Sequence, residues 1–228
     1  MKDGFDKKTI DGIDEIETPA CEGMGVCMGY YAPVTPPKIT GRRYKGTTSP
    51  DSTRSDWRTP DELFNYLDLR FGPFEVDLAA CELSAKCDLF YSKEVDSLKQ
   101  DWTAHKNMFM NPPYDNIMPW AIKAVDTISE SKKGTKITVV LPNDNSTAWF
   151  SKILSGSSRV INIISDGKRT GRISFIDAGT NKPCGGNSKG TNIFVLVSGG
   201  NKNVITEYVT AKEMSDYITK STGLVDNE

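Results

Sequence analysis

The sequence predicts an α/β domain built on a mostly parallel sheet. Three apolar runs, at residues 74–78, 108–110 and 136–141, have the composition of buried strands. A helix is predicted after the second run, because apolar residues recur there at helical spacing: Ile117, Trp120, Ala121, Ala124, Val125 and Ile128. Strands that alternate with helices favour parallel β-α-β units. We therefore expect one α/β domain over residues 55–222, closed by an antiparallel hairpin near the C-terminus.

Ordered structure is expected to begin near Asp56. The first 54 of the 228 residues carry clustered glycines and prolines without a sustained hydrophobic period, so we expect a flexible extension. Thr59 is then a candidate helix N-cap, with Pro60 at the first helical position and Glu62 completing a capping box. This helix is predicted to end at Gly72-Pro73.

The strand at residues 74–78 ends in an acid that small residues follow. Asp77 lies near its end, and Ala79 and Ala80 come next. A carboxylate beside a turn without bulky side chains can bind an ammonium group, although an aspartate that caps a turn explains Asp77 equally well. No GxGxxG motif follows this strand and no GxxxxGK[ST] motif occurs in the chain. These absences argue against a dinucleotide or nucleoside-triphosphate site.

The second half of the chain predicts further strands, helices and a long loop. Strands are predicted over residues 136–141 and 160–164, and a short helix is predicted between them over residues 146–154. Residues 173–176 and 192–197 are predicted to pair as the antiparallel hairpin. The hairpin encloses a loop at 177–191, and loops of this length are often functional. A final helix over 210–220 begins with a Thr210/Glu213 capping box.

Composition is that of an ordinary globular protein. Hydrophobic residues make up 37% of the chain and the mean hydropathy is −0.43. No run approaches the roughly 20 apolar residues of a membrane span, so we expect a cytoplasmic protein that does not bind membranes. Five cysteines without a CxxC pair and a single histidine, His105, favour free thiols and argue against a metal site.

Basic residues gather in separate places although the net charge is −2. Residues 38–54 hold five cations against one acid, and Lys168, Arg169 and Arg172 form a second cluster. Lys189 lies in the predicted long loop. Such clusters can contact nucleic-acid phosphates, although a run of charge is more often a solvated face.

The site chemistry is predicted from Asn111-Pro112-Pro113-Tyr114, where the 108–110 strand gives way to a helix. Open α/β sheets bind ligands at the carboxyl ends of their strands. An exocyclic amine is a poor nucleophile until acceptors bind its N–H groups, and the Asn111 side-chain oxygen and Pro112 carbonyl can be those acceptors. The prolines make the loop rigid, and Tyr114 offers a face on which a flipped base can stack. A polyproline-like loop is the alternative for these residues alone.

Asp96-Ser97-Leu98 lies 15 residues before Asn111, where it can cover a neighbouring strand tip. There Asp96 can accept a hydrogen bond from the amine of a cofactor adenine while Leu98 packs on the ring. A solvent-facing aspartate in a loop is the alternative for Asp96 alone.

Taken together, several segments resemble the phage-type DNA N6-adenine methyltransferases over residues 55–198: Asp56-Trp57-Arg58-Thr59-Pro60, Phe74 to Ala80, Asp96-Ser97-Leu98, Asp101-Trp102 and Asn111 to Tyr114. The resemblance implies a Rossmann-like domain that transfers the methyl group of S-adenosylmethionine to an adenine flipped out of double-stranded DNA.

The resemblance also implies roles for individual residues. The catalytic ones are Asn111, Pro112, Pro113 and Tyr114. Thr59 and Pro60 would face the methionine carboxylate, Asp77 the methionine end and Asp96 the cofactor adenine. The complete set of expected cofactor-binding residues is Trp57, Thr59, Pro60, Asp77, Ala79, Asp96 and Leu98. The expected DNA-binding residues are Lys168, Arg169, Arg172 and Lys189.

One feature departs from that pattern, and two other functions remain open. The turn after the first strand is Leu78-Ala79-Ala80-Cys81 instead of a glycine-rich turn, so no residue is predicted to hold the cofactor ribose. The same loop could serve an amine methyltransferase that acts on RNA or on a protein glutamine. The chain could also be an inactive relative that binds DNA. Methyl transfer and S-adenosylmethionine binding distinguish these functions.

Overall fold

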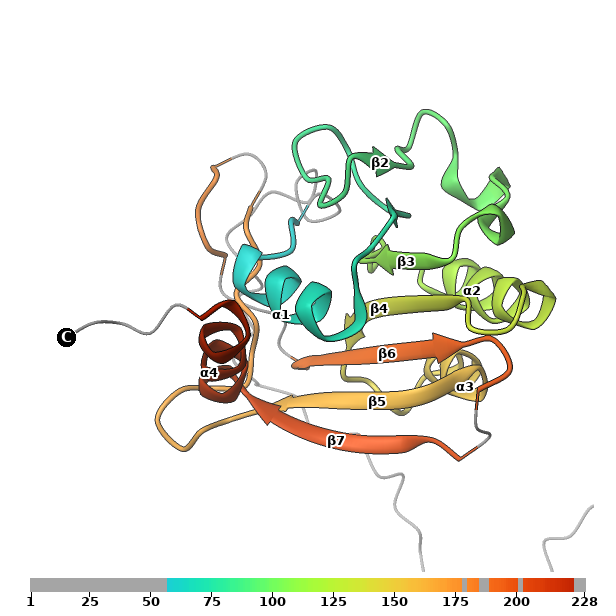
Figure 1. Cartoon of the computed structure of the whole chain (residues 1–228). Helices are drawn as coiled ribbons and strands as arrows, with labels where there is room; N and C mark the ends of the chain where they lie inside the picture. The colour runs from blue at the N-terminus through green and yellow to red at the C-terminus, as the bar shows by residue number, and fades with distance from the viewer. Residues whose placement is uncertain (1–56, 178–179, 185–188, 201–202, 224–228) are drawn as a thin grey trace, which may run out of the picture. The chain divides into compact units, whose positions relative to one another are not determined.

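The computed structural model describes residues 57–177, 180–184, 189–200 and 203–223, so the expected extension over residues 1–54 lies outside them. The described residues form a mixed α/β structure around one seven-stranded sheet, in the order β2-β1-β3-β4-β6-β5-β7 (Figure 1). Its strands are β1 (Val76–Asp77), β2 (Leu89–Phe90), β3 (Asn107–Met110), β4 (Lys136–Pro142), β5 (Ser157–Ile164), β6 (Thr191–Val197) and β7 (Ile205–Thr210). Only β6 is antiparallel to its neighbours, β4 and β5, and the other pairs are parallel.

Helices cover both faces of the sheet (Figure 1). On one face lie α1 (Asp61–Phe71) and α4 (Ala211–Thr222), and on the other lie α2 (Met118–Glu130) and α3 (Ala148–Ser155). Two short 3₁₀ helices, η3 (Ser97–Lys99) and η4 (Trp102–Ala104), come between β2 and β3. Alternate strand residues point to opposite faces, which is why the core forms two clusters, one packed by α1 and α4 and the other by α2 and α3.

The chain order creates a switch point at β1. From β1 the chain passes to β2 on one side, and it then returns to form β3 on the other side of β1. The chain leaves β1 toward β2 on one side and leaves β3 toward β4 on the other, so these two connections diverge between the carboxyl ends of β1 and β3. In open α/β sheets such a divergence leaves a crevice outside the strand ends, and ligands bind there.

The predicted hairpin is wrong in its partner. Residues 191–197 form β6, but β4 and β5 occupy both of its edges, so residues 173–176 have no place beside it. Ile176 instead forms isolated bridges with Arg58 and Pro183, outside the main sheet. The antiparallel part of the sheet is thus an inserted strand and not a terminal hairpin.

The predicted capping box at the first helix is also wrong, whereas the last one is confirmed. The N-cap of α1 is Pro60, which has no capping side chain, and the Thr59 hydroxyl bonds elsewhere. At α4, the Thr210 hydroxyl accepts from the Glu213 N–H, and the Glu213 carboxylate accepts from the Thr210 N–H at 2.8 Å. Strands β3, β4 and β5 and helices α2 and α3 lie where the sequence predicts them.

Candidate active site

The candidate site lies at the carboxyl ends of β1 and β3. Asp77 pairs with Phe109 in the parallel register, and the Leu78 N–H donates to the Phe109 carbonyl at 2.9 Å. Asn111 follows Phe109 by two residues and begins the Asn-Pro-Pro-Tyr corner, residues 111–114. Because neighbouring strands lie about 4.8 Å apart, the corner and the acid-tipped end of β1 leave the sheet side by side.

Two hydroxyl groups hold the Asn111 carboxamide. Its Nδ2 donates to Thr59 Oγ1 at 3.0 Å, and its Oδ1 accepts from the Tyr114 hydroxyl at 3.0 Å. The Tyr114 oxygen also lies 3.5 Å from the Val140 carbonyl oxygen in β4. No hydrogen bond among the described residues uses the Pro112 carbonyl. Within the described part of the chain, the Pro112 carbonyl therefore has no donor and the Asn111 amide oxygen has one.

Tyr114 belongs to a small aromatic cluster. Its ring lies 6.0 Å from the Phe175 ring at 90°, and Phe175 stacks on Trp57 with 6.2 Å between centroids. Burial raises the pKa of Tyr114, so its hydroxyl keeps its proton and acts as a donor. No site role is predicted for Phe175 from the sequence, because residues 173–176 have the pattern of a strand.

Asp77 is 2% exposed, and both of its carboxylate oxygens already accept backbone hydrogen bonds. Oδ1 accepts from the Ala79 N–H and Oδ2 from the Lys86 N–H, each at 3.2 Å. The Lys86 ammonium pairs with Asp61 at the start of α1, which ties the 79–86 loop to that helix. Burial raises the pKa of Asp77 to about 6. Of the two roles left open by the sequence, the turn-capping bonds are present, and ammonium binding stays a prediction.

Asp96 and Leu98 reach the same edge through the residue between them. Ser97 is buried, and its Oγ donates to the Leu78 carbonyl at 2.5 Å, which docks η3 at the end of β1. Leu98 packs against the adjacent core cluster. The Asp96 carboxylate is partly exposed and pairs with the Lys99 ammonium at 2.9 Å. A ligand amine would compete with Lys99 for this acid.

Arg58 connects three segments at the site, although the sequence analysis assigned it no role. Its N–H and carbonyl pair with Ile176 at 2.9 and 3.0 Å. Its guanidinium donates to the Leu83 carbonyl at 3.1 Å and to Asn181 Oδ1 at 2.5 Å. An isolated arginine has no periodic or spacing signal, so sequence alone could not identify these contacts. They fix Trp57 and Thr59 in place beside the corner.

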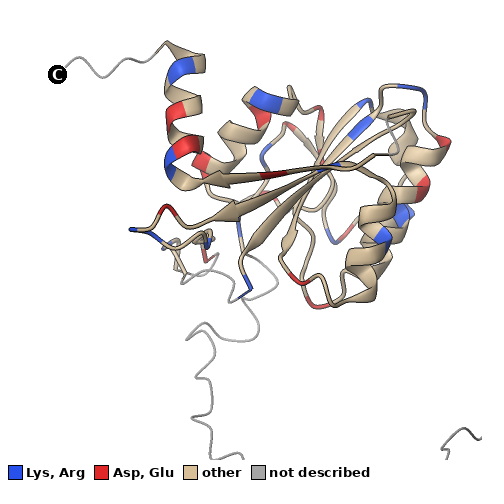
Figure 2. Cartoon of the chain, turned by 90° about the horizontal axis from the view of Figure 1, so that it is seen from below, with Lys and Arg blue, Asp and Glu red and all other residues tan. Residues whose placement is uncertain are grey.

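The basic turn (Lys168, Arg169 and Arg172) follows the carboxyl end of β5. Because β5 runs in the same direction as β3, this turn and the corner lie at the same end of the strands. All three side chains are exposed. Asp166 organises this turn, because its Oδ1 accepts the N–H groups of residues 168 and 169 at 2.9 and 2.5 Å. Helix α4, by contrast, carries Lys together with Asp and Glu (Figure 2).

Lys189 lies beside the end of β4, and its ammonium pairs with Asp144. Its charge is therefore already partly balanced by a protein carboxylate. Arg169 of the basic turn is paired in a similar way, because its Nε lies 3.5 Å from Asp166 Oδ2.

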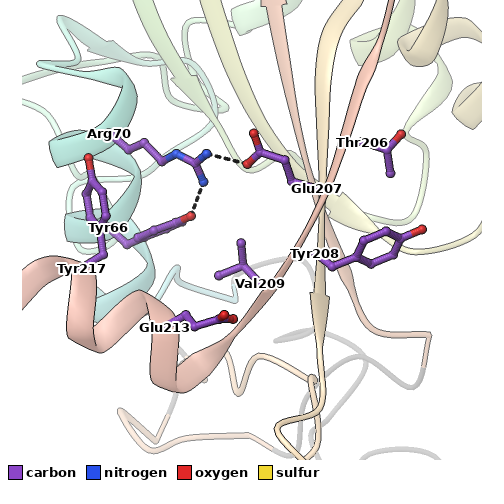
Figure 3. A pocket seen from close by; sticks show the side chains of 8 residues that line it. All are labelled: Tyr66, Arg70, Thr206, Glu207, Tyr208, Val209, Glu213 and Tyr217. Carbon is purple, nitrogen blue, oxygen red and sulfur yellow. Dashed lines mark hydrogen bonds and ion pairs between the residues drawn. The ribbon is translucent and has the colours of Figure 1, made fainter.

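A cavity of about 540 Å³ lies away from the corner, between α1, β7 and α4 (Figure 3). It is lined by Tyr66, Arg70, Thr206, Glu207, Tyr208, Val209, Glu213 and Tyr217, none of which is a predicted site residue. Arg70 points across it to Glu207 and pairs with that carboxylate at 2.5 Å (Figure 3). Arg159 pairs with the same carboxylate. The charges of Arg70 and Glu207 are therefore balanced, and the remaining charged lining residue, Glu213, accepts the capping bonds of α4.

Within the described residues, no three His, Cys, Asp or Glu side chains gather in a way that could hold a metal ion. Cys81, Cys87 and Cys184 are free thiols. No described helix combines the length and apolar character needed to cross a bilayer.

The α/β sheet, its switch point and the Asn-Pro-Pro-Tyr corner fit the class of methyltransferases that act on an exocyclic amine. A family model described as DNA N-6-adenine-methyltransferase (Dam) matches residues 46–220. The chain belongs to this family and is a DNA adenine methyltransferase.

Two relatives carry the same description. The chain is similar to the DNA N-6-adenine-methyltransferase of Escherichia phage T1, with 36% identity over 208 residues that cover 86% of each chain. It is also similar to the DNA N-6-adenine-methyltransferase of Haemophilus phage HP1, with 32% identity over 147 residues that cover 62% of this chain and 80% of the relative.

Proposed function

We propose that this DNA adenine methyltransferase takes its methyl group from S-adenosylmethionine and transfers it to N6 of an adenine flipped out of double-stranded DNA. The observation that carries the proposal is the switch point between β1 and β3. Asp77 and Asn111 stand at the two strand ends that flank it. A cofactor at Asp77 and a base at Asn111 would then share one crevice.

The corner supplies acceptors for the target amine. Asn111 Oδ1 accepts one hydrogen bond from Tyr114, and a carbonyl oxygen has a second lone pair for one amine N–H. The Pro112 carbonyl can accept from the other N–H. Both bonds favour the tetrahedral amine, whose lone pair is available for attack. The residues act mainly by positioning and need no strong general base.

Residues around β1 fit the chemistry of S-adenosylmethionine. The cofactor supplies an electrophilic methyl group on its sulfonium. A carboxylate has about four acceptor positions, so Asp77 can accept an ammonium in addition to its two backbone N–H groups. Thr59 uses its hydroxyl oxygen as an acceptor for Asn111, and its hydroxyl proton can be donated to the methionine carboxylate. Asp96 and Leu98 would bind the cofactor adenine, and Trp57, Pro60 and Ala79 would line the site.

DNA binding is assigned to the basic turn and to Lys189, where Arg169 and Lys189 each also pair with a protein carboxylate. Arginines can read guanine edges in the major groove as well as phosphates. The activity is assigned to one Rossmann-like domain over residues 55–222. We place it in the bacterial cytoplasm, where DNA and the cofactor occur together.

The test uses plasmid DNA recovered from bacteria that express the chain. The plasmid is digested with a panel of nucleases that are blocked by N6-methyladenine in different sequences. The proposal expects protection at one set of sites, and no protection in a matched culture that expresses Asn111→Ala. Full digestion by every nuclease, together with no methyl incorporation into DNA by the purified protein, would refute it and favour an inactive DNA-binding relative.

A further inference from the structure

We infer that Thr59 is a positioning residue that sets which atom of the Asn111 carboxamide faces the target amine. The inference rests on the proposed function, because it concerns the orientation of the acceptor that this function requires. The geometry points to it because Asn111 Nδ2 donates to Thr59 Oγ1 at 3.0 Å, while Asn111 Oδ1 is left on the side of Tyr114.

Thr59 is free for this task because it does not cap the helix that it precedes. Pro60 occupies the N-cap of α1, and Thr59 makes no capping bond. Thr59 is nevertheless 4% exposed, so its hydroxyl is held inside the protein and directed at a side chain 52 residues away. Backbone bonds between Arg58 and Ile176 at 2.9 and 3.0 Å anchor the preceding residue. The anchored backbone before Thr59 therefore holds its hydroxyl in place, independently of the corner.

The direction of the hydrogen bonds decides the chemistry. The oxygen and nitrogen of a carboxamide have almost the same shape, so packing alone does not distinguish them. If the group were turned over, Asn111 would offer N–H donors to an amine that is itself a donor. A threonine hydroxyl whose proton is donated to a carboxylate can only accept from Asn111, and it then selects Nδ2. The partly buried Tyr114 hydroxyl, as a donor, selects Oδ1.

This arrangement couples the two halves of the site through a single hydroxyl. On the proposed function, a carboxylate that takes the Thr59 proton also fixes the Asn111 oxygen toward the base. DNA containing the target adenine should therefore bind more tightly when the cofactor site is filled. Coupling of this kind is commonly about 5- to 150-fold.

The experiment compares Thr59→Val and Thr59→Ser with the wild type. Valine keeps the shape and removes the hydroxyl, and serine keeps the hydroxyl. With plasmid DNA and tritiated S-adenosylmethionine, both saturating, Thr59→Val should lower kcat about tenfold, the loss expected for one hydrogen bond of about 1.4 kcal/mol. Thr59→Ser should stay within about threefold of the wild type. Because Thr59→Val should also lose the coupling to the cofactor site, its KM for DNA should rise as well.

A second readout does not depend on turnover. A fluorescent duplex carrying a site that the wild type methylates is titrated with and without S-adenosylhomocysteine. The wild type and Thr59→Ser should bind it more tightly when this product is present, and Thr59→Val should lose that difference. Thr138→Val is the matched control, because Thr138 is buried in β4 and its hydroxyl has no hydrogen-bond partner among the described residues. It should behave as the wild type.

The outcomes separate the two proposals. If the wild type labels no adenine in DNA, the proposed function fails and the inference fails with it. If the wild type labels DNA and Thr59→Val matches it in kcat and in coupling, the inference alone is wrong. Equal losses in Thr59→Val and Thr59→Ser would also overturn it, because the hydroxyl would then not be the group that matters.

Discussion

The buried Asp77 carboxyl should make cofactor binding depend on pH between 5 and 7. Burial raises the pKa of this group to about 6, from the ordinary value of 3.8 for an aspartate. If an ammonium group binds beside Asp77, only the ionised carboxyl can pair with it. Binding then favours the charged form and lowers the pKa of Asp77, so protons are released when the ligand binds near pH 6.

The expected size follows from the pKa. At pH 5 about one carboxyl in eleven is ionised, whereas at pH 7 about nine in ten are. The affinity for a ligand that requires the carboxylate should therefore be about tenfold weaker at pH 5 than at pH 7. At pH 6, where half of the molecules are ionised, binding should release about half a proton per ligand.

The raised pKa of Asp77 has the opposite effect on the ligand-free protein: a rise in pH strengthens cofactor binding but lowers the stability of the fold. A pKa that is higher in the folded state means that the folded state binds a proton more tightly than the unfolded state. The contribution of Asp77 to stability is therefore fully present below pH 4 and is lost as the pH rises through 6. A difference of about two pKa units corresponds to about 3 kcal/mol. A bound ammonium group would offset part of this loss above pH 6.

Titration calorimetry with S-adenosylhomocysteine tests this reasoning, because the product keeps the ammonium group and is not consumed. Measurements at pH 5, 6 and 7 in two buffers of different ionisation enthalpy give the affinity and the number of protons released. Asp77→Asn is the control, and it should bind weakly with no such pH dependence. A wild-type affinity that stays constant from pH 5 to 7, with no proton release at pH 6, would refute the role assigned to Asp77.

Three further predictions concern the corner, the DNA contact and the last helix. Asn111→Ala should lower kcat by about 10² to 10³, as for other lost transition-state hydrogen bonds, with cofactor binding by calorimetry unchanged; substantial turnover would contradict its role. Replacing Lys168, Arg169 and Arg172 by neutral residues should reduce the slope of log K for DNA binding against log salt concentration by up to about 3. Replacing Lys132 and Lys133, which are exposed before β4 at the opposite end of the strands, should not change this slope. Thr210→Ala should cost about 1 kcal/mol by thermal unfolding, and an unchanged melting temperature would exclude a stabilising capping box.

The parts of the fold that sequence predicted are those with long apolar periods. Strands β4 and β5 and helix α2 carry such periods, and each lies close to its predicted bounds. Strand β2 has two residues and one of them is exposed, so it has no local signal. Strand β7 lies at the sheet edge with Ile205 and Tyr208 exposed, and the sequence analysis did not identify it.

The hairpin error shows why strand pairing is harder to predict than strand position. Residues 192–197 were predicted correctly as a strand, but its partners are 30 or more positions away, in β5 and, across α3, in β4. The pattern of one strand does not encode which edges other strands will occupy. The nearest apolar segment was therefore a wrong partner for it.

The candidate site was also predicted only in part. The corner and Asp77 were predicted as site residues, and in the structure both lie at the carboxyl ends of neighbouring strands. The bonds that organise them could not be predicted, because they join segments far apart in the chain. The Thr59 bond to Asn111 and the Arg58 contacts with Leu83 and Asn181 are examples. Thr59 was assigned to a helix cap because the local signal for a capping box was complete, but Pro60 took that position.

The most direct measurement of the central claim is mass spectrometry of nucleosides released from DNA after incubation with the purified protein. The substrate is unmethylated plasmid DNA, and the methyl donor is S-adenosylmethionine with a deuterated methyl group. We predict labelled N6-methyladenine with the wild type, and about 10² to 10³ times less with Asn111→Ala in the same time. Label found on cytosine, or on no base while the folded protein binds both DNA and cofactor, would contradict the claim that the corner beside Asp77 methylates adenine.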